Sequence, residues 1–343
     1  MTKNQTSSRL DSPRVSEIAT REQQNGSGSN SHPPAQGEIG FVGLGQMGTA
    51  MAANLASAGR QVIAYVRRPE QQGKLAALGL KPTTNITDLF NCEIVISMLP
   101  DDAAVRGIVF GREAVGLDGL GQGLRPGAIH LSMSTISTAA ASELASEHAL
   151  NGQGYVAAPV FGNPDAAKAR QLYIVAAGAP TDVERCRPLF DSLGQRTFVV
   201  GSDPAQANLI KLLGNMMTAT TLEMLGEIVA VLRKCRLDPA QFLDIMTSTM
   251  FSGRAHKIYG AKIVARQYAP GFRLPLALKD VRLALAEADS VGVPMPSVDV
   301  VRDRMLTGVA RGHANLDWSV LGLIAAEESG IHDPPQPKEA TVS

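Results

Sequence analysis

A lysine and two asparagines at helical spacing are the residues of this chain best suited to chemistry. Lys211 and Asn215 follow Asn208 by three and seven residues, so all three share one face of a helix. Their neighbours, such as Leu212 and Met216, are apolar, so the polar face meets either water or a cleft between domains. An ammonium in a cleft can stabilise and protonate an alkoxide, and an amide beside it can orient it.

A glycine-rich turn is the second candidate for chemistry. It follows the apolar run EIGFVG and precedes a helix expected over 49–58. In such a turn the first glycine permits the tight bend, the second lets the backbone approach a pyrophosphate, and the third lets helix and strand pack closely. A second strand, VIAYV, follows at the right distance for a dinucleotide site. The expected cofactor-binding residues of this turn are Gly43, Leu44, Gly45, Gln46, Met47 and Gly48.

The end of the second expected strand indicates which dinucleotide binds. A carboxylate there would hydrogen-bond the ribose 2′-hydroxyl of NAD, but the sequence has Arg67 and Arg68. Two guanidiniums suit a 2′-phosphate, so NADP(H) is favoured over NAD(H); the alternative is an exposed basic turn. Met98, Leu99 and Pro100 follow another apolar run, and we expect them beside the cofactor because strand ends of such sheets face the crevice.

A two-domain architecture is expected to hold these residues. Over 38–201, strand-length apolar runs alternate with helix-length segments, which predicts a Rossmann-type, mostly parallel sheet. The runs are EIGFVG, VIAYV, IVISM, AIHLSM, GYVAA, LYIVAAG and TFVVG. Over 202–331 helical periodicity dominates, at 204–233, 238–248, 276–291 and 296–310, which predicts an all-α domain for substrate binding and oligomerisation. The fold class is therefore α/β followed by all-α.

Composition narrows the function classes. A chain of 343 residues suffices for two domains. Lys+Arg and Asp+Glu are both 32, giving no net charge, so neither a nucleic acid nor an anionic membrane is an expected partner. Three scattered cysteines and the absence of HExxH spacing give no reason to expect a metal. Residues 1–37 and 332–343 have the composition of a disordered arm and tail, and without a secretory signal the expected location is cytoplasmic.

Four motifs, taken in order, resemble the β-hydroxyacid dehydrogenase family. This group contains 3-hydroxyisobutyrate dehydrogenase, tartronate semialdehyde reductase and glyoxylate/succinic semialdehyde reductase. The motifs are GLGQMG at 43–48, SMSTIS at 132–137, APVFGN at 158–163, and Lys211 with Asn215, followed by Lys279-Asp280. The resemblance covers about residues 38–328 and extends over both expected domains.

The resemblance implies a function and roles for individual residues. It implies hydride transfer between NADP(H) and a small aldehyde or keto acid, or its hydroxy acid, with Lys211 as proton donor or acceptor and Asn215 orienting it. Thr135 and Lys279 would reach the cofactor, and Ser134 the substrate. Because an unperturbed lysine is a ready acid but a poor base, reduction is the expected direction.

The match departs from the family at one loop. Members that act on small hydroxy acids have Ser-Gly-Gly where this chain has Phe161, Gly162 and Asn163, and there the loop holds the substrate carboxylate. Backbone N–H groups can still receive an anion, but an aromatic wall replaces the hydroxyl. A larger or more apolar aldehyde or keto acid is therefore expected, unless Phe161 turns into the core. Ser132 stands where the family often has Asp, for which the sequence offers no reason.

Two other functions compete with this interpretation. Imine reductases share the fold and NADPH but typically have Asp or Tyr at the lysine position, so Lys211 argues against that activity. A non-catalytic NADPH-binding interaction module would have lost the lysine. The apolar helices of the second half suggest a homodimer or homotetramer, as the family implies.

Overall fold

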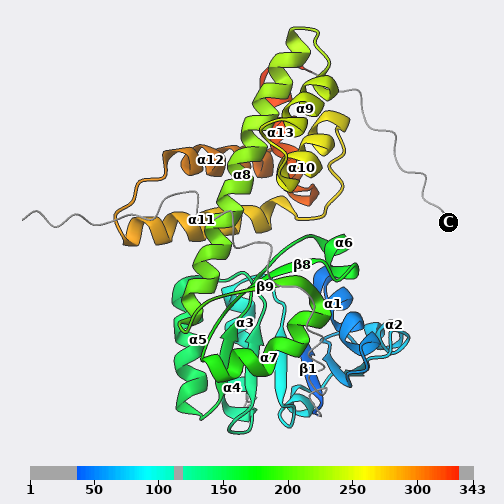
Figure 1. The fold of residues 1–343 in the computed structure, drawn as a ribbon, viewed down its shortest axis with the longest axis vertical. Helices are drawn as coiled ribbons and strands as arrows, with labels where there is room; N and C mark the ends of the chain where they lie inside the picture. The colour runs from blue at the N-terminus through cyan, green and yellow to red at the C-terminus, as the bar shows by residue number, and fades with distance from the viewer. Residues whose placement is uncertain (1–36, 112–118, 332–343) are drawn as a thin grey trace, which may run out of the picture. The chain divides into compact units, whose positions relative to one another are not determined.

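The computed structural model of the chain describes residues 37–111 and 119–331. The expected arm and tail at 1–37 and 332–343 therefore lie outside the described residues, apart from Gly37. The described residues belong to one compact unit, whose elements are labelled in Figure 1. Within the described part of this unit, no helix is long and apolar enough to cross a bilayer.

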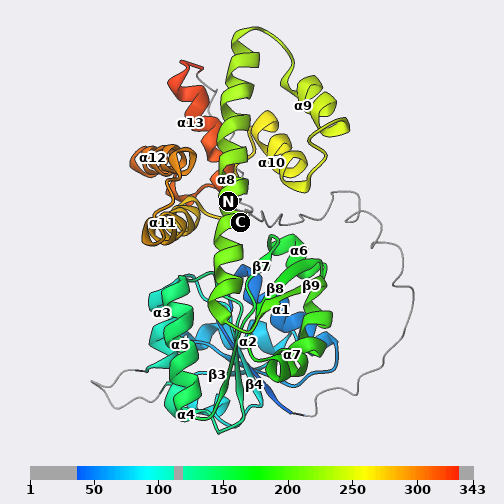
Figure 2. The same cartoon turned by 60° about the vertical axis from the view of Figure 1, so that its left-hand side comes forward.

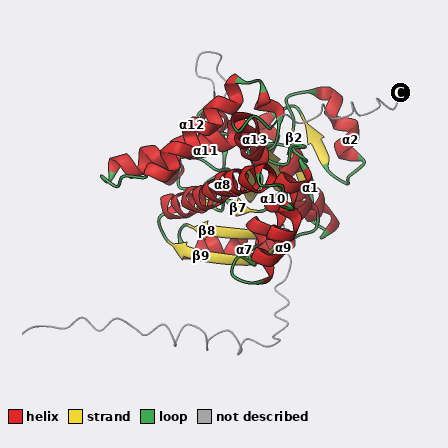
Figure 3. Ribbon diagram, turned by 90° about the horizontal axis from the view of Figure 1, so that it is seen from above, coloured by secondary structure: helices red, strands yellow, loops and turns green. Residues whose placement is uncertain are grey.

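The first half is built on one nine-stranded sheet. Its strands are β1 (Ile39–Val42), β2 (Val62–Tyr65), β3 (Lys81–Thr83), β4 (Ile94–Ser97), β5 (Ile129–Ser132), β6 (Gly154–Ala157), β7 (Val160–Phe161), β8 (Leu172–Ala177) and β9 (Gly194–Gly201). Their order is β3-β2-β1-β4-β5-β6-β8-β7, with β9 beside β8 (Figure 3). Only the pairs β6/β8 and β7/β8 are antiparallel, so the expected mostly parallel sheet is confirmed. The two strands that were not expected, β3 and β7, are too short to show a periodic pattern.

Helices cover both faces of this sheet. They are α1 (Gln46–Ser57), α2 (Gln72–Ala76), α3 (Asp102–Val109), α4 (Leu120–Gly123), α5 (Thr138–Leu150), α6 (Pro164–Lys168) and α7 (Pro180–Leu193). Helix α1 contacts α6 and α7, whereas α5 contacts α3; Figure 2 shows the two groups on either side of the strands. One apolar core, which includes Phe41 and Ile96, lies beneath α1 and α7. Another, which includes Ile136 and Leu144, lies beneath α5.

The regular elements described in the second half are helices, joined by turns and one isolated β-bridge, which confirms the expected all-α region. It contains α8 (Pro204–Lys234), α9 (Pro239–Ser248), α10 (Arg254–Ala265), α11 (Leu274–Ser290), α12 (Pro296–Ala310) and α13 (Leu321–Glu328). The Asp203 side chain caps the start of α8, and Pro204 is its first residue. Helix α8 contacts α10 to α13 and also α5, β6 and β8. Since α8 spans both halves, it can carry polar residues to their junction.

A chain of buried side chains anchors the carboxyl end of β4. The Gln153 amide donates to two backbone carbonyls, so its oxygen must accept from His148 Nδ1 at 2.6 Å. His148 Nε2 then accepts from His130 Nδ1 at 2.9 Å, and His130 Nε2 accepts from Ser97 Oγ at 2.8 Å. Burial lowers the pKa of both histidines, so both rings are neutral at pH 7. The chain fixes Ser97 immediately before the Met98–Pro100 turn.

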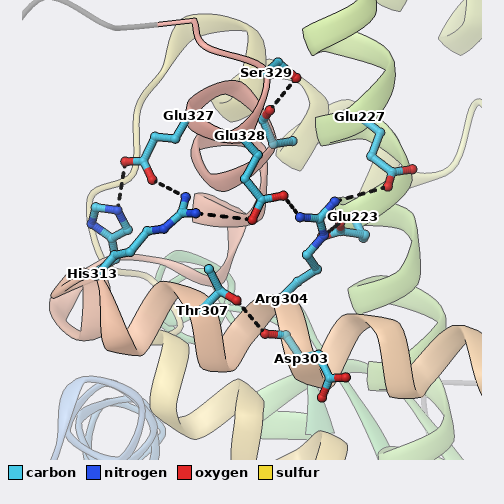
Figure 4. Close-up of polar contacts among 11 residues, drawn as sticks. Glu223, Glu227, Asp303, Arg304, Thr307, His313, Glu327, Glu328 and Ser329 are labelled. Atoms are coloured by element: carbon cyan, nitrogen blue, oxygen red, sulfur yellow. Dashed lines mark hydrogen bonds and ion pairs between the residues drawn. The ribbon is translucent and has the colours of Figure 1, made fainter.

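An ion-pair cluster joins α8, α12 and α13 (Figure 4). Arg304 Nε lies 2.9 Å from Glu223, and its other nitrogens pair with Glu227 and Glu328. Glu223 is buried, which raises its pKa to about 7 despite the adjacent guanidinium. Arg304 is thus the cation that permits a carboxylate to remain charged between these helices.

Replacing Arg304 with alanine is expected to destabilise the fold by about 3 kcal/mol at pH 8, because it leaves the Glu223 carboxylate buried and unpaired. The loss should be smaller at pH 6. The raised pKa means that the folded state holds the Glu223 proton more tightly than the unfolded chain does, and protonation removes the uncompensated charge. Urea unfolding at the two pH values measures this difference. Arg302→Ala, on the exposed side of α12, should have little effect; equal losses in the two variants would contradict the argument.

Candidate active site

The glycine-rich turn joins β1 to α1 and is closely packed at its first and third glycines. Gly43 has a φ of 94°, which favours glycine, and a Cβ there would lie 2.2 Å from the Met98 carbonyl oxygen. A Cβ on Gly48 would lie 1.9 Å from the Gly43 oxygen, whereas one on Gly45 would meet nothing within 4 Å. The first turn of α1 carries no acidic residue. The turn therefore has the shape and the open helix N-terminus that a pyrophosphate requires.

The other residues expected near the cofactor surround this turn. Leu44 and Met47 are half-buried and pack on the core beneath α1, while Gln46 is exposed as the first residue of the helix. Within Met98–Pro100, the Met98 amide donates to the Val42 carbonyl, which places this turn against the glycines.

Arg67 and Arg68 are exposed directly after β2. Strands β1 and β2 are parallel and paired up to Val42 and Tyr65, so the two arginines and the glycine turn lie at the same edge of the sheet. The open backbone at Gly45 leaves room for a dinucleotide at this edge.

Lys211, Asn215 and Asp280 form a hydrogen-bonded chain. Lys211 Nζ donates to Asn215 Oδ1 at 2.9 Å, and Asn215 Nδ2 donates to Asp280 Oδ2 at 2.6 Å. Their exposed fractions are 8%, 6% and 1%. An ionised carboxylate only accepts hydrogen bonds, so the Asn215 NH2 must face Asp280 and its oxygen must face the lysine. The alternative of a water-exposed polar face on this helix is therefore wrong.

The surroundings of Lys211 change its acidity. Burial lowers its pKa to about 8; the carboxylate of Asp280 opposes this shift and the charge of Lys279 adds to it. An amine with this pKa can both donate and accept a proton near neutral pH. The expectation that reduction is favoured assumed an unperturbed lysine. Burial weakens the bias toward the acid form, and the favoured direction stays a prediction.

Lys279 and Thr135 connect this chain to the first half. Lys279 Nζ lies 2.9 Å from Asp280 Oδ1 and donates to the Thr135 backbone carbonyl. A second hydrogen bond joins the same two segments, because the Thr138 hydroxyl donates to the Glu287 carboxylate. The segment after β5 and helix α11 are thus held together beside Lys211, so Thr135 and Lys279 do lie together near the candidate catalytic chain.

Ser134 lies between the turns that follow β4 and β5. Its hydroxyl is buried and accepts a hydrogen bond from the Leu99 amide at 2.8 Å. The same hydroxyl donates to the Ser97 carbonyl at 3.4 Å. The side chain that was expected to meet substrate therefore ties the turn after β4 to the turn after β5. Its expected contact with the substrate stays a prediction.

The loop of Phe161, Gly162 and Asn163 also has defined structural roles. Phe161 belongs to β7, is half-buried against the core beneath α5, and its ring centroid lies 4.3 Å from Lys211 Nζ. Each of the two alternatives for Phe161 is thus partly correct: it packs on the core and also forms a wall below the lysine. Asn163 Oδ1 caps α6 by accepting from the Ala166 amide, so its side chain is already engaged. The anion-binding role of this loop stays a prediction.

Three further residues of the site had no assigned role. The sequence gives Asp280 no role beyond its place next to Lys279. Its position opposite Asn215 depends on the packing of α11 against α8. Gly214 lies within α8, where glycine is unfavourable. A glycine at such a position indicates that another group packs closely against the helix backbone. Asn208 is 1% exposed, and its side-chain atoms have no hydrogen-bond partner within the described ranges.

The side chains gathered around Lys211 are suited to proton transfer. Across 37–111 and 119–331, no group of three or more His, Cys, Asp or Glu side chains is arranged to hold a metal ion. The available groups are a buried amine with a lowered pKa, an amide that orients it, and an aromatic wall.

Both halves of the chain match models of known protein families. Residues 38–201 match the NAD binding domain of 6-phosphogluconate dehydrogenase, and residues 205–323 match the family described as NAD-binding of NADP-dependent 3-hydroxyisobutyrate dehydrogenase. An uncharacterized oxidoreductase of Bacillus subtilis, YfjR, is 36% identical over 83% of this chain and 98% of its own length. Glyoxylate/succinic semialdehyde reductase 1 of Arabidopsis thaliana is 31% identical over 83% of this chain and 96% of its own.

Solved structures show the same fold. The 3-hydroxyisobutyrate dehydrogenase of Mycobacterium tuberculosis aligns with a TM-score of 0.74 and 25% identity over 84% of this chain and 98% of its own. An imine reductase of Streptomyces aurantiacus aligns with a TM-score of 0.57 and 21% identity over 83% and 98%, which is a likeness of fold alone.

Proposed function

The chain belongs to the β-hydroxyacid dehydrogenase family, and we propose that it reduces a small aldehyde or keto acid with NADPH, using Lys211 as the proton donor. It is an oxidoreductase with NAD(P)-binding regions, of the class that acts on CH–OH groups. The observation that carries the proposal is the buried Lys211 amine, fixed 2.9 Å from Asn215 Oδ1 and joined to the first half through Asp280 and Lys279.

The proposed mechanism divides the work between cofactor and protein. The cofactor, when bound, supplies the hydride. Lys211 donates a hydrogen bond to the substrate carbonyl oxygen, stabilises the negative charge that develops there, and transfers its proton. Asn215 fixes the direction of the amine, and Asp280 fixes the direction of the Asn215 amide. In the oxidative direction the neutral amine, accessible because of its pKa of about 8, accepts the proton from the alcohol.

The wall formed by Phe161 bears on the substrate. The Arabidopsis relative is named for glyoxylate and succinic semialdehyde, and we place this chain in the same broad class of small carbonyl compounds. An aromatic side chain beside the amine favours a substrate whose group at this position is apolar. A larger or more apolar aldehyde or keto acid is therefore the proposed substrate class.

The proposed activity is tested by NADPH oxidation against a panel of glyoxylate, succinic semialdehyde, methylmalonate semialdehyde, aromatic aldehydes and cyclic imines. Turnover of one carbonyl compound that depends on Lys211 supports the proposal. Exclusive turnover of imines favours the imine reductase alternative, and NADPH binding without any turnover favours a non-catalytic binding module.

The cofactor preference for NADPH is proposed from Arg67 and Arg68. Replacing both with alanine should lower the NADPH-over-NADH ratio of kcat/KM by about 100-fold, because two charge-assisted hydrogen bonds to the 2′-phosphate are lost. Initial rates with each cofactor measure this ratio. Lys74→Ala, an exposed cation on the following helix, should leave it unchanged. An unaltered preference in the double variant assigns the phosphate contact to other residues.

A second copy of the chain is the proposed partner of α8. Exposed apolar side chains recur along one side of this helix at intervals of three, four or seven residues. This spacing is typical of a helix that packs against another helix. These side chains are Ile210, Leu213, Met217, Met224 and Val231, with exposed fractions of 41%, 42%, 76%, 40% and 62%. Sedimentation should show a homodimer or homotetramer, and Met217→Glu should shift it toward the monomer; an unchanged distribution would place the interface elsewhere.

A further inference from the structure

Phe161 and Gly214 fit against each other directly below the Lys211 amine. A Cβ on Gly214 would lie 2.4 Å from Phe161 Cζ and 2.6 Å from its Cε1, so the ring rests on the bare backbone of α8. Gly214 lies between Lys211 and Asn215 along the helix. Glycine is unfavourable in a helix interior, and here its missing side chain is what admits the ring.

The ring face and the Asn215 oxygen contact the same ammonium. Lys211 Nζ is 4.3 Å from the ring centroid, inside the range in which the negative face of an aromatic ring attracts a cation, and 2.9 Å from Asn215 Oδ1. A lysine ammonium has three N–H groups on a flexible stem. With one N–H on the amide and the ring occupying another side, the remaining N–H is available to a substrate oxygen.

We propose that Phe161 is a positioning residue for Lys211: its ring, seated on Gly214, acts with Asn215 to hold the ammonium in the orientation from which it meets the substrate. This inference rests on the proposed function, in which Lys211 is the proton donor. It gives the aromatic side chain a task that a serine in the same loop could not perform, because a hydroxyl has no extended negative face.

The charges around Lys211 predict the direction of the effect. Burial and the charge of Lys279, on α11, lower the pKa of Lys211, whereas Asp280, also on α11, raises it. The ring of Phe161, on β7, also lies against the amine and stabilises the protonated form. Phe161→Leu keeps an apolar side chain but removes the ring face, so the pKa of Lys211 should fall by about one unit. Gly214→Ala, which places a methyl group where the ring rests, should move it in the same direction.

The experiment is an NMR titration of the full-length protein labelled with ¹³C-lysine. The Lys211 signal is identified by its loss in Lys211→Met, and its Cε shift is followed with pH in the wild type, Phe161→Leu and Gly214→Ala. The matched control is Phe198→Leu, which removes the ring beneath Arg196, 4.6 Å from the guanidinium carbon and on the edge strand β9. No substrate is needed, so the readout does not depend on turnover.

The possible outcomes separate this inference from the proposed function. A lower titration midpoint in both Phe161→Leu and Gly214→Ala, with none in Phe198→Leu, supports the positioning role. An unchanged or higher midpoint in Phe161→Leu overturns it, even if carbonyl reduction still depends on Lys211. A lowered midpoint in a protein that reduces no carbonyl compound supports the positioning role and contradicts the proposed activity instead. If Phe161→Leu does not fold, Gly214→Ala decides alone by the same criteria.

Discussion

Lys211→Met should lower kcat for carbonyl reduction by about 1,000-fold, because both the proton donor and the charge that stabilises the developing alkoxide are lost. Methionine preserves the length and apolar character of the side chain. Removing a buried ammonium relieves its desolvation, and Asp280 keeps Lys279 as its partner, so the fold should persist. Affinity for NADPH should change by less than about twofold, since the glycine turn and the two arginines are untouched. Single-turnover kinetics and fluorescence titration with NADPH measure the two quantities separately.

The pH dependence provides a second test of the role of Lys211. With a pKa of about 8, reduction should decline above this pH as the ammonium loses its proton, and oxidation should rise toward it as the neutral amine forms. Both limbs should disappear in Lys211→Met. Lys234→Met, the same change at an exposed position near the end of the same helix, should retain the full rate and both limbs. Undiminished turnover by Lys211→Met would exclude the lysine from proton transfer.

The parts of the site that could be predicted from the sequence are those in which neighbours along the chain determine the geometry. The glycine turn is one case, because a positive φ at Gly43 and the close contact at Gly48 depend on residues only a few positions apart. The shared face of Lys211 and Asn215 is another, because helical periodicity fixes it. In both cases a local pattern contains the necessary information, and the longer strands and most of the long helices were recognised for the same reason, whereas β3, β7, α10 and α13 were not.

The remaining parts depend on contacts between distant segments. Asp280 meets Asn215 only because α11 packs against α8, and no local pattern indicates which polar residue will lie opposite that amide. The ring of Phe161 is brought below Lys211 by the antiparallel pairing of β7 with β8. The lowered pKa of Lys211 could not be read from the sequence for the same reason, since burial is a property of the packed structure. The contact of Ser134 with the Leu99 amide was also not foreseen, because that amide lies on the neighbouring turn.

Asp280→Asn should reduce carbonyl reduction at pH 8 by about 10- to 100-fold, although this side chain does not touch the substrate. The wild-type carboxylate accepts from Asn215 Nδ2 through one oxygen and pairs with Lys279 through the other. An asparagine has one acceptor oxygen for these two donors. Either Asn215 turns and presents its NH2 group to Lys211, or Lys279 loses its partner. The variant also lacks the anion that raises the pKa of Lys211, so that pKa should fall below 8.

The pH profile separates this positioning role from a general loss of structure. If Asp280 acts through Lys211, the decline of reduction in Asp280→Asn should begin at lower pH than in the wild type. The loss should therefore be smaller at pH 6, where the amine is again protonated, than at pH 8. Asp299→Asn, which removes the same charge from a surface ion pair on α12, should keep the wild-type profile and rate. A loss of equal size at every pH, with the limb unmoved, would show that Asp280 only supports the packing of α11 against α8 and leaves the amine unaffected.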